Sequence, residues 1–405
     1  MPIATPLSRK PRVSRGPGPF QRGLTILLLL LNSWTWVLAQ DEPFKPPLTT
    51  DEGFKVPQPG YQFRFPHDDG AHPGFKVEWW YITGHLFTES NRRFGFEATF
   101  FRFANRVSTD QEISNPGAFE SDVTYMAHMA VTDIGGQSFN YQERLNRSGW
   151  DAYSKVGTLD VRNGNWSLKI LAYPDKTMGP TMQLNGGIDA KVAFKLTLKP
   201  TKPRSIFGKD GVERKAANAT SASHYITYTR LATSGKLTID GKTHDVTGSA
   251  WMDHEISSSQ LGDNQDGWDW TSIHLEDGRD IMAYRLRTTD GKTDPFSVVA
   301  WIDRDGNITQ YTPTDFKWIP KRHWTSPATG GKYPIEWIIE TKSPDADEPI
   351  RLHIKPLMDN QELQGERGGV AYWEGACDVY DEEGKRIGRA YLELSGYVDR
   401  LSTLF

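Results

Sequence analysis

Asp253, His254 and Glu255 follow Trp251 closely and form the first group of side chains that could perform acid–base chemistry. On a β-strand, the two carboxylates share one face and the imidazole takes the other. Two carboxylates that lie close together can separate in pKa, which leaves one protonated as an acid. A polar strand end at a domain joint is the alternative, but buried charge beside tryptophan usually needs a reason. The spacing therefore indicates a candidate site.

Asp269 is the next candidate acid, and it lies in a predicted β-hairpin. Residues 268–287 alternate on both sides of an Asp277-Gly278 pair, which is typical of a two-residue turn. A turn centred on that pair matches two tryptophans with two arginines: Trp268 with Arg287, and Trp270 with Arg285. The other face then holds Asp269 among mostly apolar side chains, Tyr284 included. A carboxylate there is either a satisfied structural group or a site.

Two further acids stand beside aromatic pairs. Glu78 precedes Trp79 and Trp80 and shares a strand face with apolar residues; it is either a site residue or an acid paired with Arg102. The second group is Tyr372, Trp373 and Glu374. For it we favour an aromatic core strand with an outward-facing acid, because this chain has many aromatic side chains to bury.

Several chemistries lack their usual sequence signals. The ten histidines show no HxxxH or other tight ligand spacing, so we expect no metal site. The chain has no GxSxG elbow, phosphate loop or dinucleotide fingerprint, and we expect no cofactor. Lys and Arg (47) nearly balance Asp and Glu (51), which argues against nucleic-acid binding. The single cysteine, Cys377, rules out an internal disulfide.

The elements that must position these residues are strands. From residue 61 onward, short alternating segments are separated by turn pairs such as Asp240-Gly241, and no long stretch has helical periodicity. This pattern favours an all-β sandwich or barrel. A weak internal repeat, called the echo below, relates two motifs that lie 189 residues apart. They are Trp79-x-Tyr81-x3-His85-Leu86 and Trp268-x-Trp270-x3-His274-Leu275. The echo predicts two related barrels in tandem, over 61–262 and 263–405.

The N-terminus has the features of an export signal. Five basic residues precede an apolar run at 24–31, and small residues at 37–39 suit cleavage after Ala39. We expect residues 1–39 to be a signal peptide and the mature chain to be secreted or periplasmic. A retained N-terminal anchor is the alternative. The Pro- and charge-rich residues 40–60 are predicted to be an extended mature N-terminus or linker.

The chain resembles the exported AttH-like family, which includes carotenoid 1,2-hydratase (hydroxyneurosporene synthase). The resemblance lies in collinear stretches that run to the C-terminus: 65–86, 248–270, 323–337, 355–380 and 393–397. It implies two lipocalin-like antiparallel β-barrels with a lipophilic pocket near their junction. Some relatives hydrate an isoprenoid C=C bond and others are described as secreted hydrolases. Carried over by position, the family motif covers Glu78, Trp79, Trp80, 253–255, 268–270 and 372–374.

These observations lead to one mechanistic expectation. Hydrating an alkene needs a carboxylic acid to protonate carbon, aromatic faces to stabilise the cation and a base to activate water. We expect Asp253 to be the acid, His254 the base or its orienter, and Glu255 and Asp269 further catalytic candidates. The expected substrate-binding residues are Glu78, Trp79, Trp80, Trp251, Trp268, Trp270, Tyr284, Tyr372, Trp373 and Glu374. A lipophilic small molecule is the expected ligand, with peripheral membrane association as an option; the alternatives are a non-catalytic carrier and a hydrolase.

Overall fold

A computed structural model of the chain describes residues 44–108, 110, 122–365 and 370–401. The predicted signal peptide, its cleavage after Ala39 and the first four residues of the predicted linker lie outside the described residues. From Lys45 onward the described residues form one compact unit. They are almost entirely β-structure, with a short 3-10 helix at His67–Asp69. No helix within them is long and apolar enough to cross a membrane.

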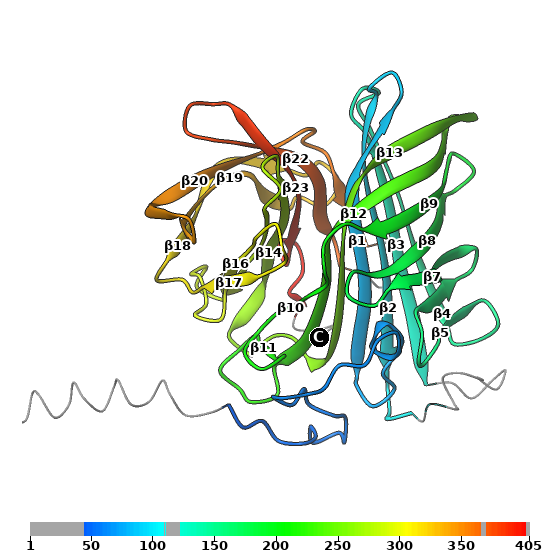
Figure 1. The fold of residues 1–405 in the computed structure, drawn as a ribbon, viewed down its shortest axis with the longest axis vertical. Helices are drawn as coiled ribbons and strands as arrows, with labels where there is room; N and C mark the ends of the chain where they lie inside the picture. Colours follow the sequence, from blue (N-terminus) through cyan, green and yellow to red (C-terminus); the bar gives the residue numbers. More distant parts are fainter. Residues whose placement is uncertain (1–43, 109, 111–121, 366–369, 402–405) are drawn as a thin grey trace, which may run out of the picture. The chain divides into compact units, whose positions relative to one another are not determined.

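Two large antiparallel sheets build the fold, which confirms the predicted all-β class of two tandem lipocalin-like barrels (Figure 1). The first sheet has 13 strands, in the order β4-β3-β2-β1-β13-β12-β9-β8-β7-β6-β5, with β10 and β11 paired to β12. The second has 10 strands, in the order β17-β16-β15-β14-β23-β22-β20-β19-β18, with β21 paired to β22.

The strand bounds divide cleanly between the two sheets. The first sheet contains β1 (Val77–Thr88), β2 (Arg93–Ala104), β3 (Val123–Asp133), β4 (Ser138–Arg147), β5 (Ala152–Ser154), β6 (Asp160–Asn163), β7 (Trp166–Asp175), β8 (Gly179–Ile188), β9 (Val192–Pro200), β10 (Ser205–Ile206), β11 (Glu213–Arg214), β12 (Ala222–Ile239) and β13 (Lys242–Ser259). The second contains β14 (Gln265–Leu275), β15 (Asp280–Thr288), β16 (Val298–Ile302), β17 (Ile308–Tyr311), β18 (Phe316–Thr325), β19 (Lys332–Ser343), β20 (Ala346–Pro356), β21 (Glu362–Leu363), β22 (Tyr372–Tyr380) and β23 (Arg386–Ser395). The change of sheet falls at residues 260–264, a segment that includes the expected domain boundary at 262.

Both sheets curl so that their opposite edges approach each other. In the first, β4 reaches β6 through side chains: Arg144 donates to the carbonyl oxygen of Asn163 at 3.1 Å and Asn146 donates to its side chain at 2.5 Å. In the second, the edge strands β17 and β18 follow one another along the chain. Each sheet thereby encloses its own apolar core, one around Trp80 and Phe96 and the other around Trp301 and Trp337.

A third apolar cluster lies between the two sheets and explains why β1 is so hydrophobic. Trp80 and Ile82 of β1 point into the core of the first sheet, whereas Trp79 and Tyr81 join Trp270 in the cluster between the sheets. Because both faces of β1 are covered, eleven of its twelve residues are buried. The outer faces of the two sheets therefore meet at a buried interface. In Figure 1, β1, β12 and β13 of the first sheet lie next to β14, β22 and β23 of the second.

The β14–β15 hairpin exists, but its predicted register is wrong by one residue. Trp268 pairs with Leu286, Asp269 with Arg285 and Trp270 with Tyr284. The turn has three residues instead of two, because Leu275 and Arg279 bracket it and Gly278 adopts φ +93°. A left-handed glycine at the third position is the common solution for a three-residue hairpin loop. A one-residue shift moves a strand's partners to the other face, so Arg285 and Arg287 do not brace the tryptophans.

Residues 40–60 were expected to be an extended mature N-terminus or linker, and their described part, 44–60, packs onto the first sheet. Thr49 and Lys55 form a β-bridge, and Phe54 and Val56 are almost fully buried. Phe54 packs in a cluster with Val123 and Tyr125 of β3. Two apolar side chains within a Pro- and charge-rich segment are enough to anchor it.

Candidate functional site

A pocket lies between the outer faces of the two sheets. Its free volume, including its opening to solvent, is about 900 Å³. Strands β1, β2, β3, β12 and β13 supply one wall, and β14, β15, β22 and β23 supply the other. Eight of its twenty lining residues are Trp, Tyr or Phe: Trp79, Tyr81, Phe101, Tyr225, Trp268, Trp270, Tyr284 and Tyr372. Such a lining suits a largely apolar ligand.

The two walls of the pocket are built from equivalent positions of the two sheets. Strand β1 pairs with β13 in the first sheet as β14 pairs with β23 in the second. Tyr81 thus faces Asp253 across its ladder, and Trp270 faces Glu393. The matched lining residues are Trp79 with Trp268, Tyr81 with Trp270, Asp253 with Glu393, Glu255 with Ser395, and Tyr225 with Tyr372. The internal echo therefore marks the strands that frame the pocket, and each sheet supplies one carboxyl group at the same place.

Asp253 supplies the carboxyl group of the first sheet. It is 2% exposed, and it accepts hydrogen bonds from Tyr225 (2.7 Å), Thr227 (2.6 Å) and Trp251 (2.7 Å). Burial raises the pKa of Asp253 to about 7, although these three hydrogen bonds oppose the shift. Since all three donors favour the ionised form, Asp253 suits the role of a carboxylate acceptor.

Glu393 supplies the carboxyl group of the second sheet, and it is not among the site residues predicted from the sequence. Its Oε1 accepts hydrogen bonds from Trp268 Nε1 at 2.7 Å and from Ser395 Oγ at 2.8 Å. Its Oε2 has no hydrogen-bond partner among the described residues. Burial raises the pKa of Glu393 to about 7, against those two hydrogen bonds. A carboxyl group with one unoccupied oxygen and a pKa near neutrality can hold a transferable proton.

Other polar groups of the lining are held by close partners. Glu255 is paired with Lys215 at 3.1 Å and accepts a hydrogen bond from Ser223. Tyr372 of the second sheet is bonded to His128 Nδ1 of β3 at 2.6 Å, a contact that joins the two walls. Trp270 Nε1 donates to the hydroxyl of Tyr225 at 3.1 Å, a second contact across the pocket. These bonds fix the orientation of the walls.

Two buried glutamates lie behind the pocket wall. Tyr81, which lines the pocket, donates a short hydrogen bond to Glu374 Oε1. Burial raises the pKa of Glu374 well above its usual range, and the neighbouring Glu393 and Glu97 add to the shift. Glu97 accepts a short hydrogen bond from Thr99, and burial raises its pKa to about 8. Burial therefore favours the neutral form of both glutamates. Glu374 is not the outward-facing acid that the sequence suggested.

Asp269 lies outside the pocket lining and belongs to an ion cluster. Its two oxygens accept bonds from Arg287 Nη1 at 2.6 Å, Arg285 Nη1 at 2.9 Å and Tyr397 at 2.7 Å. Asp269 is fully buried, and Arg287 is 7% exposed. The corrected hairpin register places both arginines on the face of Asp269. This geometry makes Asp269 a structural carboxylate that fastens β14 to β15.

His254 and Glu78 face away from the pocket and form a separate network inside the first sheet. His254 Nε2 lies 2.9 Å from Glu78 Oε1, and its ring stacks on Trp80 at 4.7 Å between centroids. His72 Nδ1 contacts the same Glu78 oxygen at 2.8 Å, and Arg102 donates to the other at 3.1 Å. His254 is therefore not placed to act as a base on a ligand in the pocket.

The two remaining candidates also lie outside the pocket lining. Trp251 lies beside a second, smaller cavity, whose lining also includes His85 and His274. Trp373 is fully buried in the core of the second sheet. Of the site residues predicted from the sequence, the pocket brings together Trp79, Asp253, Glu255, Trp268, Trp270, Tyr284 and Tyr372.

The pocket residues that sequence reasoning missed include Tyr81, His128, Lys215, Tyr225 and Glu393. The echo offered a signal for one of them. If strands 79–86 and 268–275 are equivalent, the strand that pairs with the second should carry a counterpart of Asp253. Glu393 fills that position. Lys215 lies between β11 and β12 in a segment of irregular structure. No sequence pattern there indicates that it lines a pocket.

Comparisons with known proteins give a consistent result. The profile of AttH-like proteins matches residues 56–397. A solved structure from Nitrosomonas europaea, assigned to AttH, is 33% identical, with 85% of this chain and 100% of that chain covered and a TM-score of 0.74. Kievitone hydratase from Nectria haematococca is 15% identical, with 88% and 99% covered and a TM-score of 0.59, a likeness that concerns the fold. No protein of curated function matches the sequence significantly.

Proposed function

The chain belongs to the AttH-like family, and we propose that it adds water to a C=C bond of a lipophilic substrate bound between its two sheets. The observation that supports this proposal is the pair Asp253 and Glu393. Asp253 is buried and Glu393 is half-buried, desolvation raises the pKa of each carboxyl group to about 7, and the two come from equivalent positions in opposite walls of an aromatic pocket. An isoprenoid chain with a trisubstituted double bond is the substrate class that suits this lining, because its protonation gives a tertiary cation.

In the first step, Glu393 acts as the acid. The π electrons of the alkene take the proton from Glu393 Oε2 and form a new C–H bond, which leaves a cation on the neighbouring carbon. Tryptophan faces stabilise a nearby cation by about 0.5–2 kcal/mol each, and Trp79, Trp268 and Trp270 all line the pocket. The ionised Asp253 adds a negative charge on the same wall as Trp79.

In the second step, water attacks the cation and Asp253 accepts the released proton. Oδ1 of Asp253 already accepts two hydrogen bonds and Oδ2 accepts one, so Oδ2 retains a lone pair. The product is a tertiary alcohol. Glu393 is left ionised and Asp253 protonated, and exchange with solvent through the open mouth restores the starting state. The sum is one alkene and one water converted to one alcohol.

The proposal predicts a bell-shaped pH dependence. Glu393 must be protonated, so turnover falls as pH rises above about 7. Asp253 must be ionised, so turnover also falls as pH drops below about 7. With both pKa values near 7, the two groups titrate together and the maximum should be narrow.

Matched variants test these roles. Purified protein is assayed against a panel of isoprenoid lipids by mass spectrometry for products heavier by one water. General acid–base catalysis contributes about 10²- to 10⁴-fold, so Glu393→Gln and Asp253→Asn should each lose at least about 10²-fold. Glu340→Gln, which removes a partly exposed carboxylate of β19 bonded to Lys317, should keep full activity. Equal activity in all three variants contradicts the proposal.

A carrier without catalysis is the second function that this pocket supports. The observation in its favour is that Glu255 and Asp253 are already held by protein donors, as expected for a wall that only binds. A carrier would retain an isoprenoid lipid unchanged, and Glu393→Gln would leave its affinity within about twofold. The hydratase would instead release a hydrated product that depends on Glu393.

We also propose that the protein acts after export. The basic and apolar segments before Ala39 support this. Expression in a bacterial host, followed by N-terminal sequencing of the periplasmic fraction, should give a chain that begins at Gln40. An intact N-terminus in the membrane fraction would instead support the retained anchor.

A further inference from the structure

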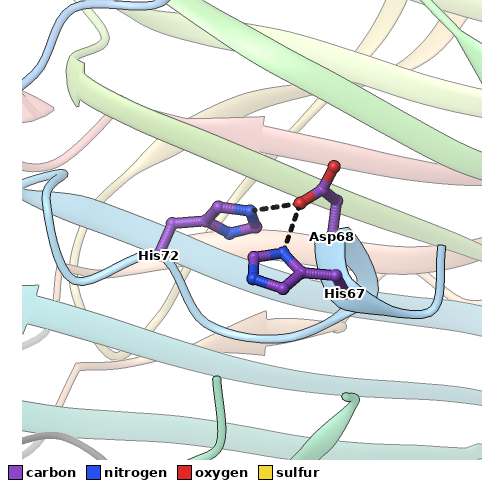
Figure 2. A group of neighbouring side chains, drawn as sticks. All are labelled: His67, Asp68 and His72. Atoms are coloured by element: carbon purple, nitrogen blue, oxygen red, sulfur yellow. Dashed lines mark hydrogen bonds and ion pairs between the residues drawn. The ribbon is translucent and has the colours of Figure 1, made fainter. Parts of the chain in front are cut away.

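His67, Asp68 and His72 bring three potential metal ligands together at one end of the network inside the first sheet (Figure 2). His67 Nδ1 lies 2.7 Å from Asp68 Oδ1, and His72 Nε2 lies 3.3 Å from the same oxygen. Figure 2 shows both imidazoles directed at that oxygen, His67 and Asp68 from the 3-10 helix and His72 from the loop that follows.

We propose that these three residues bind a divalent transition-metal ion, with zinc as the ion to test. Two imidazoles and one carboxylate form a donor set that Zn²⁺ accepts, with a further position left for water. Ligands placed about 2.0 Å from a tetrahedral zinc ion lie roughly 3.3 Å from one another. The separation of 3.3 Å already matches, and the separation of 2.7 Å needs to open by only about 0.6 Å.

The surroundings of His72 favour a metal ligand. Its other ring nitrogen, Nδ1, lies 2.8 Å from Glu78 Oε1, and its backbone N–H donates to Glu78 Oε2 at 3.0 Å. A carboxylate bonded to the second nitrogen orients a ligating histidine and increases its basicity. Glu78 is itself fixed by Arg102 and His254. Glu78, the carboxylate that orients His72, is therefore fully buried and already held in position.

Hydrogen bonding alone leaves Asp68 Oδ1 crowded. Three groups crowd this single oxygen: the ring nitrogens of His67 and His72 lie within hydrogen-bonding distance of it, and the hydroxyl of Tyr61 donates to it at 3.2 Å. A carboxylate oxygen offers about two lone pairs. A metal ion between the two imidazoles and Oδ1 replaces two of the three competing contacts. Meanwhile the backbone N–H of Arg64 holds Oδ2 at 2.6 Å and keeps Oδ1 in position.

A metal ion here would fasten a segment that completes the core of the first sheet. The backbone carbonyl of Asp69 accepts a bond from Trp80 Nε1 at 3.0 Å, and its carboxylate accepts one from Tyr228 at 2.7 Å. Ala71 is buried in the same core. The side chain of His67 is 39% exposed, so an ion can enter from solvent. The site is separate from the pocket and does not depend on the proposed hydratase activity.

Calorimetric titration of untagged, chelator-treated protein tests the site. Wild type should bind one Zn²⁺ with a Kd in the micromolar range or tighter and should not bind Mg²⁺ at the same concentrations. His67→Ala and Asp68→Asn should each weaken zinc binding at least tenfold. His323→Ala, which removes an exposed histidine of β18, should match wild type.

Two further readouts keep the result clear. Co²⁺ in the site should give the visible absorption bands of a low-symmetry metal centre, lost in His67→Ala. Zinc should raise the melting temperature of wild type, and a chelator should reverse the rise. Because His67 is partly exposed, its alanine variant should fold, which circular dichroism checks. Absence of stoichiometric zinc binding by wild type, or unchanged binding by folded His67→Ala, overturns the proposal.

Discussion

Replacement of Asp269 by asparagine tests the assignment of this residue to structure instead of catalysis. The variant keeps the shape of the side chain but removes the charge that two arginines share. Arg287 is 7% exposed and would keep a buried charge without its counter-ion, while an amide N–H would face one of the two guanidinium groups. Removing one partner of a buried ion pair costs about 3–5 kcal/mol. At 1.4 kcal/mol per factor of ten, the folded-to-unfolded ratio should drop by about 10²- to 4 × 10³-fold.

Guanidinium unfolding at pH 7, followed by tryptophan fluorescence, measures this loss. The matched control is Asp277→Asn, in the turn of the same hairpin. Asp277 pairs with Arg279 at the surface, where its side chain is 40% exposed, so its loss should cost less than about 1 kcal/mol. If Asp269→Asn unfolds at the wild-type midpoint, the ion cluster does not stabilise the fold. If it keeps its stability but loses turnover, Asp269 is catalytic after all.

Three other perturbations test separate parts of the account. Burial raises the pKa of Glu97 from 4.5 to about 8, so its contribution to stability is present below about pH 4.5 and is lost as pH rises through 8. Glu97→Gln should therefore reduce the loss of unfolding free energy between pH 5 and 8. Identical pH slopes of the unfolding free energy in the variant and in wild type would refute this. Tyr225→Phe removes one hydrogen bond from the Asp253 carboxylate, which is about 1.5–3 kcal/mol for a charged partner. The acidic limb of the pH–rate profile should therefore move up by roughly one to two pH units, and an unmoved limb would assign that limb to another group. Cys377 is fully buried and burial raises its thiol pKa, so a thiol reagent should modify it only on unfolding, and fast labelling of native protein would contradict its place in the core.

The sequence predicted the architecture well because its signals are local. Alternation along 77–86 and 268–275, turn glycines and the absence of helical periodicity were enough for the all-β class. The echo between those two stretches identified equivalent strands. The hairpin register was missed because Asp277-Gly278 suits both a two-residue loop and the last two positions of a three-residue loop. That difference of one residue decided the partners of Asp269.

The site was only half predictable for a physical reason. Asp253, Glu255, Trp268 and Trp270 sit in a dense motif that attracts notice, whereas Glu393 stands alone in a strand near the C-terminus. The alternation of apolar and polar residues indicates which face of a strand a side chain lies on, but it does not indicate what covers that face. His254 and Asp253 are neighbours in sequence and are separated by the thickness of the sheet. His67, Asp68 and His72 meet through a 3-10 turn and a loop, whose geometry carries no periodic signal.

If Glu393 and Asp253 add water across a C=C bond in the pocket between the sheets, the hydroxyl oxygen and one carbon-bound hydrogen of the product come from solvent. Turnover of an isoprenoid lipid in H₂¹⁸O, and separately in D₂O, tests this by mass spectrometry of the product. We expect one ¹⁸O and one carbon-bound deuterium per product molecule, both reduced at least about 10²-fold in Glu393→Gln. Recovery of the bound lipid unlabelled from wild-type protein would contradict catalysis and leave the pocket as a carrier site.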